Sequence, residues 1–133
     1  MKKIPISFGY ERTKRVAKSI YKKIEKVICP ILDGEEIHFN ATGFGHLIRK
    51  LKIRSRNEQK RRFRLIPFAK KIISESKTIE DYREKKMKKG KTVKEWALVS
   101  TFGSLTIKLI VRQVGKGNKH FYSIMQKDTK KSP

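Results

Sequence analysis

The chain of 133 residues is poor in cysteine, in acidic residues and in long apolar segments. Its single cysteine, Cys29, excludes a disulfide framework within the chain and a zinc site built on several thiolates. A lone cysteine suits a reducing compartment, so we expect a cytoplasmic protein. No apolar run approaches ~18 residues, so we expect no transmembrane helix and no membrane partner. The N-terminal residues 1–12 turn polar too early for a secretory signal peptide.

The scarcity of acidic residues leaves a large positive charge. Lysine and arginine number 35 against 12 aspartate and glutamate residues, which gives a net charge of +23 at pH 7. Such a charge destabilises the compact state by self-repulsion, and a polyanionic partner is the simplest reason to retain it. A solubilising surface is the ordinary alternative. Binding to a membrane surface is less favoured, because no helical segment pairs a basic face with exposed aromatics.

The basic residues are concentrated in residues 49–64 and 83–94. Cations of this kind bind nucleic acids by releasing counterions from the phosphates. We therefore expect a nucleic acid, RNA above all, as partner. The expected phosphate contacts in the first cluster are Arg49, Arg54, Arg56, Arg61, Arg62 and Arg64.

The length predicts a single domain over residues 1–133, with flexible tails at 1–10 and 127–133. Apolar spacing first follows a helical period and later changes to a period of two. The predicted fold class is α+β, with two or three N-terminal helices packed on a C-terminal antiparallel β-meander. Helices are expected over 11–28, 43–51 and 57–74 (broken near Pro67), and strands over 35–40, 78–83, 92–101, 104–113 and 119–126.

The glycine turns of the meander predict its register. A two-residue turn at Phe102-Gly103 pairs Leu98 with Ile107, and a turn at Lys116-Gly117 pairs Leu109 with Ile124. The apolar residues then share one face of the sheet, with Tyr122 among them. The other face carries a mixed set that suits a ligand, namely Lys108, Arg112, Phe121 and Ser123. Among the aromatics, only Phe121 is expected to stack on unpaired bases.

The residue types favour chemistry without a metal. No cluster of His, Asp, Glu or Cys has metal-ligand spacing, and acidic residues are too few for a two-metal nuclease. We expect no metal and no small-molecule cofactor. RNA supplies its own nucleophile, the 2′-OH, so the protein needs only a base, an acid and cations around the phosphorus.

The candidate residues for this reaction come from the short helix and the strands. His46 is a candidate base or acid, and His120 reaches the site from its rim. Arg112 and Ser123 are expected to contact a non-bridging phosphate oxygen, and Lys108 lies on the same face.

Four segments carry a family resemblance: Phe44-Gly45-His46-Leu47-Ile48-Arg49, Arg61-Arg62 with the helix that follows, residues 108–115 and residues 119–125. Over residues 35–126 the chain resembles the barnase–EndoU–colicin–RelE (BECR) group of small RNase toxins. It is most similar to the compact members found in phage and toxin–antitoxin contexts. The resemblance does not extend to residues 1–34, which would be a helix specific to one branch of the group.

The resemblance implies metal-independent RNA cleavage that leaves a 2′,3′-cyclic phosphate. It implies a site on the sheet face with His46, Arg112 and Ser123, and an acidic antitoxin or immunity protein as partner. Because catalytic residues vary between branches of the group, the roles of His120, Lys108 and Arg49 stay open.

Three hypotheses follow. The first is an endoribonuclease toxin. The second is a non-catalytic RNA- or DNA-binding protein such as a ribosome-associated factor, which the composition supports equally well. The third is an effector or inhibitor that engages an acidic protein surface. The specific target RNA is not predicted.

Overall fold

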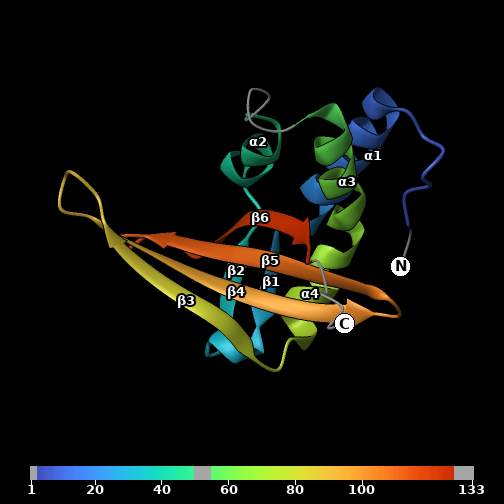
Figure 1. Ribbon diagram of the computed structural model, residues 1–133. Coiled ribbons are helices and arrows are strands. Elements are labelled where there is room, and N and C mark those ends of the chain that lie inside the picture. Colours follow the sequence, from blue (N-terminus) through green and yellow to red (C-terminus); the bar gives the residue numbers. More distant parts are fainter. Residues whose placement is uncertain (1–2, 50–54, 128–133) are drawn as a thin grey trace, which may run out of the picture.

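A computed structural model describes residues 3–49 and 55–127 of the chain (Figure 1). The architecture is α+β, as predicted, with all described helices before residue 76 and four of the six described strands after it. The elements in chain order are α1 (Tyr10–Ile24), β1 (Lys26–Cys29), the 3-10 turn η1 (Pro30–Leu32), β2 (Glu35–His38), α2 (Ala41–Arg49), α3 (Arg56–Leu65), the 3-10 turn η2 (Ile66–Phe68), α4 (Ala69–Glu75), β3 (Ile79–Lys86), β4 (Thr92–Phe102), β5 (Leu105–Val114) and β6 (His120–Gln126).

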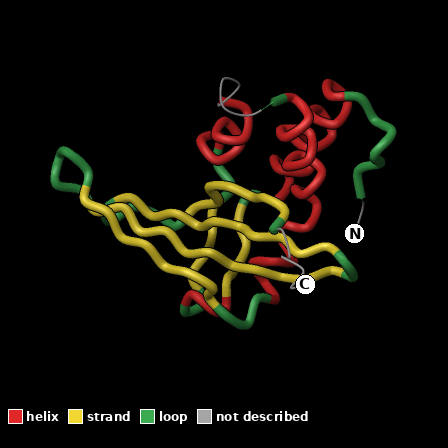
Figure 2. Tube along the Cα trace, viewed as in Figure 1, coloured by secondary structure: helices red, strands yellow, loops and turns green. Residues whose placement is uncertain are grey.

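The strands form one six-stranded sheet in the order β1-β2-β6-β5-β4-β3. The predicted C-terminal meander is its larger part, and every neighbouring pair is antiparallel except β2 and β6. Those two strands run parallel and pair through His38 and His120. Helices α1, α2 and α3 stand together beyond the β6 side of the sheet (Figures 1 and 2). Among the described residues, no helix is both long and apolar enough to cross a membrane.

The first helix is shorter than predicted. It ends at Ile24 because Glu25 takes a φ of 58°, a left-handed value that stops a helix. The residues after it form the edge strand β1, in which Val27 is buried and Ile28 is exposed. Apolar spacing placed both residues on a helical stripe, but it cannot tell a short strand from a last helical turn.

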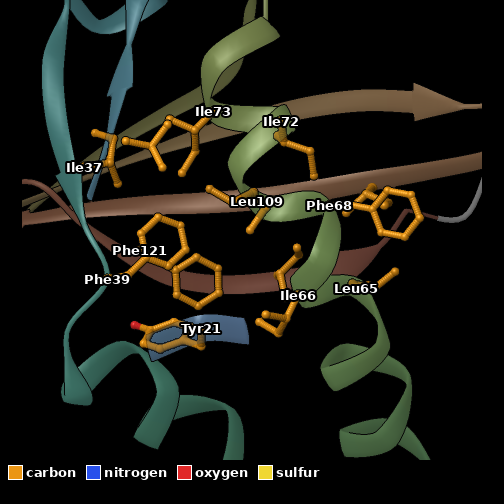
Figure 3. Packing of buried hydrophobic residues seen from close by; sticks show 14 of the residues in the cluster. Tyr21, Ile37, Phe39, Leu65, Ile66, Phe68, Ile72, Ile73, Leu109 and Phe121 are labelled. Carbon is orange, nitrogen blue, oxygen red and sulfur yellow. The ribbon is translucent and has the colours of Figure 1, made fainter. Parts of the chain in front are cut away.

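The predicted break in the third helical segment is confirmed. Pro67 lies in η2, between α3 and α4, where its missing N–H costs no helical hydrogen bond. Phe63, Ile66 and Ile73 keep a helical spacing across this break, and all three are fully buried. They belong to a core between the helices and the sheet, in which the side chains of Ile66, Leu109 and Phe121 converge (Figure 3).

The N-terminal segment, expected as a tail, packs on the helices over its described part. Ile4 is buried in the core, and its carbonyl accepts a hydrogen bond from Arg64 Nε at 3.3 Å. Lys60 Nζ donates to the carbonyl of Ile6.

The β4–β5 hairpin turns at Gly103-Ser104, one residue later than predicted, and Gly103 has a φ of 63°. Leu98 therefore pairs with Leu109 instead of Ile107. A displacement of two residues leaves every side chain on its predicted face, because side chains alternate with a period of two. The predicted inner face is correct along these two strands, with Leu98, Ile107 and Leu109 fully buried.

The β5–β6 hairpin contains a β-bulge that the sequence analysis missed. Leu109 pairs with Ile124 as predicted, but the register shifts between Ile110 and Val111. Beyond the shift Val111 pairs with Phe121. Phe121 is therefore a core residue with no exposed surface, and the prediction that it stacks on bases from the open face is wrong. A bulge sends the residues on either side of it to faces that strict alternation does not predict.

Candidate active site

Helix α2 is held tightly on β6, and this contact sets the position of His46. The helix is capped by Asn40, whose Oδ1 accepts a hydrogen bond from Gly43 N at 3.1 Å. A Cβ atom at Gly43 would lie 2.4 Å from the Phe121 carbonyl oxygen, so only glycine permits this approach. As a result the imidazole of His46, 5 % exposed, stacks on Tyr122 with ring centroids 4.1 Å apart.

Tyr122 joins His46 to the candidate cation. The guanidinium Cζ of Arg112 lies 4.3 Å from the centroid of the Tyr122 ring, and Arg112 Nε lies 3.3 Å from Glu95 Oε2. The side chain of Arg112 is 25 % exposed. The cation–π contact and the ion pair together hold the guanidinium beside Tyr122 and Glu95. An imidazole from α2, a phenol from β6, a guanidinium from β5 and a carboxylate from β4 therefore contact one another in turn.

His120 lies beside Arg112 because of the bulge. The two residues are partners across β5 and β6, whereas the unbulged register paired His120 with Gln113 on the inner face. Burial lowers the pKa of His120, the nearby charges of Arg112 and His38 lower it further, and a hydrogen bond with the Asn118 backbone opposes them. A histidine with a lowered pKa is neutral at pH 7, which is the form that accepts a proton.

Ser123 follows Tyr122 in β6 and contacts a different arginine. Its Oγ accepts a hydrogen bond from Arg62 Nη1 at 3.1 Å, and Arg62 Nε donates to Glu58 Oε2 at 2.9 Å. Ser123 is 3 % exposed, so its hydroxyl is placed to orient Arg62 rather than to meet a phosphate directly. A hollow of about 470 Å³ opens beside this network, between α3 and the end of β6.

Lys108 lies on the same sheet face as Arg112 but lines a separate hollow of about 200 Å³. Arg83 and two carboxylates, Asp81 and Glu95, line this hollow with it. Glu95 also pairs with Arg112, so the same carboxylate lines this hollow and contacts Arg112. The structure therefore brings Lys108 near the His46–Tyr122–Arg112 row without adding it to that row.

The arginines predicted to bind phosphates do not form one common surface. Arg56 lies over the Tyr10 ring at 4.7 Å, Arg61 is exposed beside Glu58, and Arg64 holds the N-terminal segment. Arg54 and the side chain of Arg49 lie outside the part of the chain that the structure describes.

Sequence reasoning missed Tyr122 and Glu95. Strict alternation sent Tyr122 to the core and Phe121 to the open face, and the bulge exchanges them. The signal was present in residues 120–124, where two adjacent aromatics interrupt the alternation. Within residues 3–49 and 55–127, no group of three or more His, Cys, Asp or Glu side chains is arranged to hold a metal ion.

Comparison with known proteins identifies a family for this chain. No curated protein and no solved structure matches the chain significantly. A family model, large polyvalent protein-associated domain 3, matches residues 9–122, a segment that runs from the residue before α1 into β6. It includes His46, Arg112, His120 and Tyr122, and Ser123 lies just beyond it. Because the match spans most of the chain, the protein belongs to the large polyvalent protein-associated domain 3 family, a domain of polymorphic toxin-like proteins.

Proposed function

We propose that this protein is a metal-independent endoribonuclease, the toxic component of a polymorphic toxin-like system. The observation that carries the proposal is the pairing of His120 with Arg112 across the bulge, with the guanidinium seated on Tyr122. It joins a histidine of lowered pKa to a fixed cation, which are the two groups that cleavage by a 2′-OH needs most. The likeness to the small RNase toxins supports the same reaction.

In the proposed reaction His120 removes the proton of a ribose 2′-OH. The 2′ oxygen bonds to the adjacent phosphorus, and the bond from phosphorus to the 5′ oxygen of the next nucleotide breaks. That 5′ oxygen takes a proton from an acid, for which His46 is the candidate. The products are a 2′,3′-cyclic phosphate and a 5′-OH, and no water, metal or cofactor is consumed. Arg112 stabilises the charge that develops on the non-bridging oxygens.

The remaining residues support this centre. Tyr122 contacts both the imidazole of His46 and the guanidinium of Arg112 and orients these two groups. Ser123 acts through Arg62, and Lys108 with Arg83 contacts the phosphates on either side of the cleaved bond. Arg61, exposed on α3, extends the basic surface.

The partner proposed for the toxin is an acidic antitoxin or immunity protein. A chain of net charge +23 attracts such a partner over long range, and the family's toxin-like context suits it. The site of action is the cytoplasm, where the RNA substrate is.

One observation favours the non-catalytic alternative, an RNA- or DNA-binding protein. Glu95 pairs with Arg112 and Glu58 with Arg62, so carboxylates neutralise two central cations, and His46 is almost fully buried. Such a surface suits binding through the remaining lysines better than reaction at these arginines.

The deciding experiment incubates the purified protein with a defined RNA in EDTA and identifies the new termini. The endoribonuclease gives 2′,3′-cyclic phosphates. His120→Gln and Arg112→Gln each lower the rate by roughly a hundredfold or more. Lys116→Ala, which removes an exposed cation at the same end of the sheet, leaves the rate unchanged. His46→Phe keeps the aromatic stack and removes the proton donor, so it separates a chemical role from a structural one.

If the wild type binds the RNA tightly, with strong salt dependence, and leaves it intact, cleavage is overturned and the binding protein is favoured. Circular dichroism of each variant confirms that the fold is retained.

A further inference from the structure

Helix α2 contains two glycines, and packing explains one of them. A Cβ at Gly43 would collide with Phe121 and with the Tyr21 hydroxyl, whereas a Cβ at Gly45 would meet nothing within 4 Å. Glycine inside a helix lowers its stability relative to alanine. Gly45 is instead part of the wall of a half-open hollow of about 480 Å³ between α1 and α2. Its missing side chain keeps this space open.

The floor of the hollow is aromatic. Tyr21, Phe39 and Phe44 line it, and each is at least 93 % buried within the protein. The Tyr21 ring meets Phe39 edge-on at 5.3 Å and Phe44 at 5.1 Å, and Figure 3 shows Tyr21 beside the Phe39 and Phe121 rings. These contacts hold the floor rigid, so a ligand would find it already formed.

The rim of the hollow is mainly cationic. Lys18 and Lys22 lie one turn apart on α1, are exposed, and line the same side. Asn40 and Glu25 add an amide and a carboxylate. An aromatic floor below a pair of lysines suits a ligand with a planar apolar part and an anionic part, and the volume falls in the usual range for ligand sites.

We propose that this hollow binds one unpaired nucleotide of an RNA strand, with the base on the aromatic floor and the phosphate at Lys18 and Lys22. Unpaired bases stack on aromatic side chains, and lysine binds phosphate as a point charge. The choice of RNA as ligand rests on the proposed function. Gly45 and His46 are adjacent in α2, so a base held here lies on the same helix that positions His46.

The binding test uses ligands that contain no bond to cleave. Adenosine and uridine 5′-monophosphates are titrated into the full chain and followed by the NMR shifts of the Phe44 and Gly45 amides. We expect saturable shifts at these amides, with ribose 5-phosphate binding at least about tenfold more weakly because it lacks the base. Equal binding of ribose 5-phosphate, or no shift at Gly45, would overturn the proposal.

Two matched pairs of variants locate the site. Gly45→Leu fills the hollow, and Thr42→Leu places the same side chain on α2 away from it. We expect Gly45→Leu to lose nucleotide binding by at least about tenfold and Thr42→Leu to retain it. Lys22→Ala should weaken binding and reduce its salt dependence, whereas Lys23→Ala, its exposed neighbour outside the hollow, should not.

The outcomes separate this proposal from the nuclease. Nucleotide binding that is lost in Gly45→Leu supports the hollow even if the wild type never cleaves RNA. If the wild type cleaves RNA and Gly45→Leu binds nucleotides as tightly as the wild type, the hollow is overturned and the reaction centre is unaffected. If the leucine variant does not fold, unchanged nucleotide binding in Lys22→Ala has the same meaning.

Discussion

Alanine at Gly43 and alanine at Gly45 should change the stability of the protein in opposite directions. The two positions lie two residues apart in α2, and the substitution is the same. At Gly43 the new methyl group would lie 2.4 Å from the Phe121 carbonyl oxygen and 2.5 Å from the Tyr21 hydroxyl oxygen. The carbonyl belongs to β6 and cannot rotate away, and moving Tyr21 breaks its 2.6 Å hydrogen bond to the Asn40 carbonyl.

The magnitude follows from three contributions. Forcing a methyl group into a packed contact costs about 1–3 kcal/mol. Losing the Tyr21 hydrogen bond costs about 1 kcal/mol. Alanine regains about 1 kcal/mol of helix propensity over glycine. Gly43→Ala should therefore lower the free energy of unfolding by about 1–3 kcal/mol. At Gly45 only the last contribution applies, so Gly45→Ala should raise it by about 0.5–1 kcal/mol.

Urea unfolding followed by the fluorescence of Trp96, the single tryptophan, measures both changes. The midpoints should move apart while the m-values stay equal, since the surface exposed on unfolding is the same. Midpoints that move in the same direction would refute the described approach of α2 to β6.

Three further outcomes follow from buried polar groups. The pKa of His120 is lowered in the folded state, so the unfolded chain binds more protons, and the free energy of unfolding should fall as the pH drops through about 6.5. His120→Gln should make this dependence on pH less steep. If urea titrations of the variant show the same dependence as the wild type, another group causes it. Tyr21→Phe removes the hydrogen bond to Asn40 and should cost about 1 kcal/mol by urea unfolding; no loss would argue against that bond. Lys119→Met removes the 2.6 Å ion pair with Glu35, and because Glu35 is half-exposed the free energy of unfolding should change by less than about 1 kcal/mol. The Lys119 ammonium lies 5.0 Å from the Trp96 ring centroid, so the same substitution should alter the fluorescence emission of Trp96. An unchanged spectrum would contradict that contact.

Much of the fold was predictable because it depends on local spacing. The break near Pro67 follows from the missing N–H of proline, and the inner face of β4 and β5 follows from alternation. The extent of α1 was not predictable in this way. Val27 fits the apolar spacing of the helix as well as it fits the strand, and the positive φ of Glu25, which ends the helix at Ile24, decided the outcome.

The sequence indicated some residues of the candidate site and not its arrangement. His46, Arg112 and His120 were singled out by residue type and segment, and the structure places all three around Tyr122 or beside Arg112. Phe121 was wrong, and Tyr122 was missed, because one extra residue in β6 exchanges their faces. Ser123 is near the site but buried, since Arg62 of α3 covers its hydroxyl.

The amino-acid sequence alone determined the positive charge, the α+β order of elements and the alternation that buries Leu98 and Leu109. These properties depend on composition and on neighbours within a few positions. Tertiary structure decided which side chains meet. The contact of Gly43 with β6 and the open space at Gly45 depend on segments far apart in the chain, and the bulge opposite Val111 depends on how β6 pairs with β5. Spacing within one segment carries no information about such contacts.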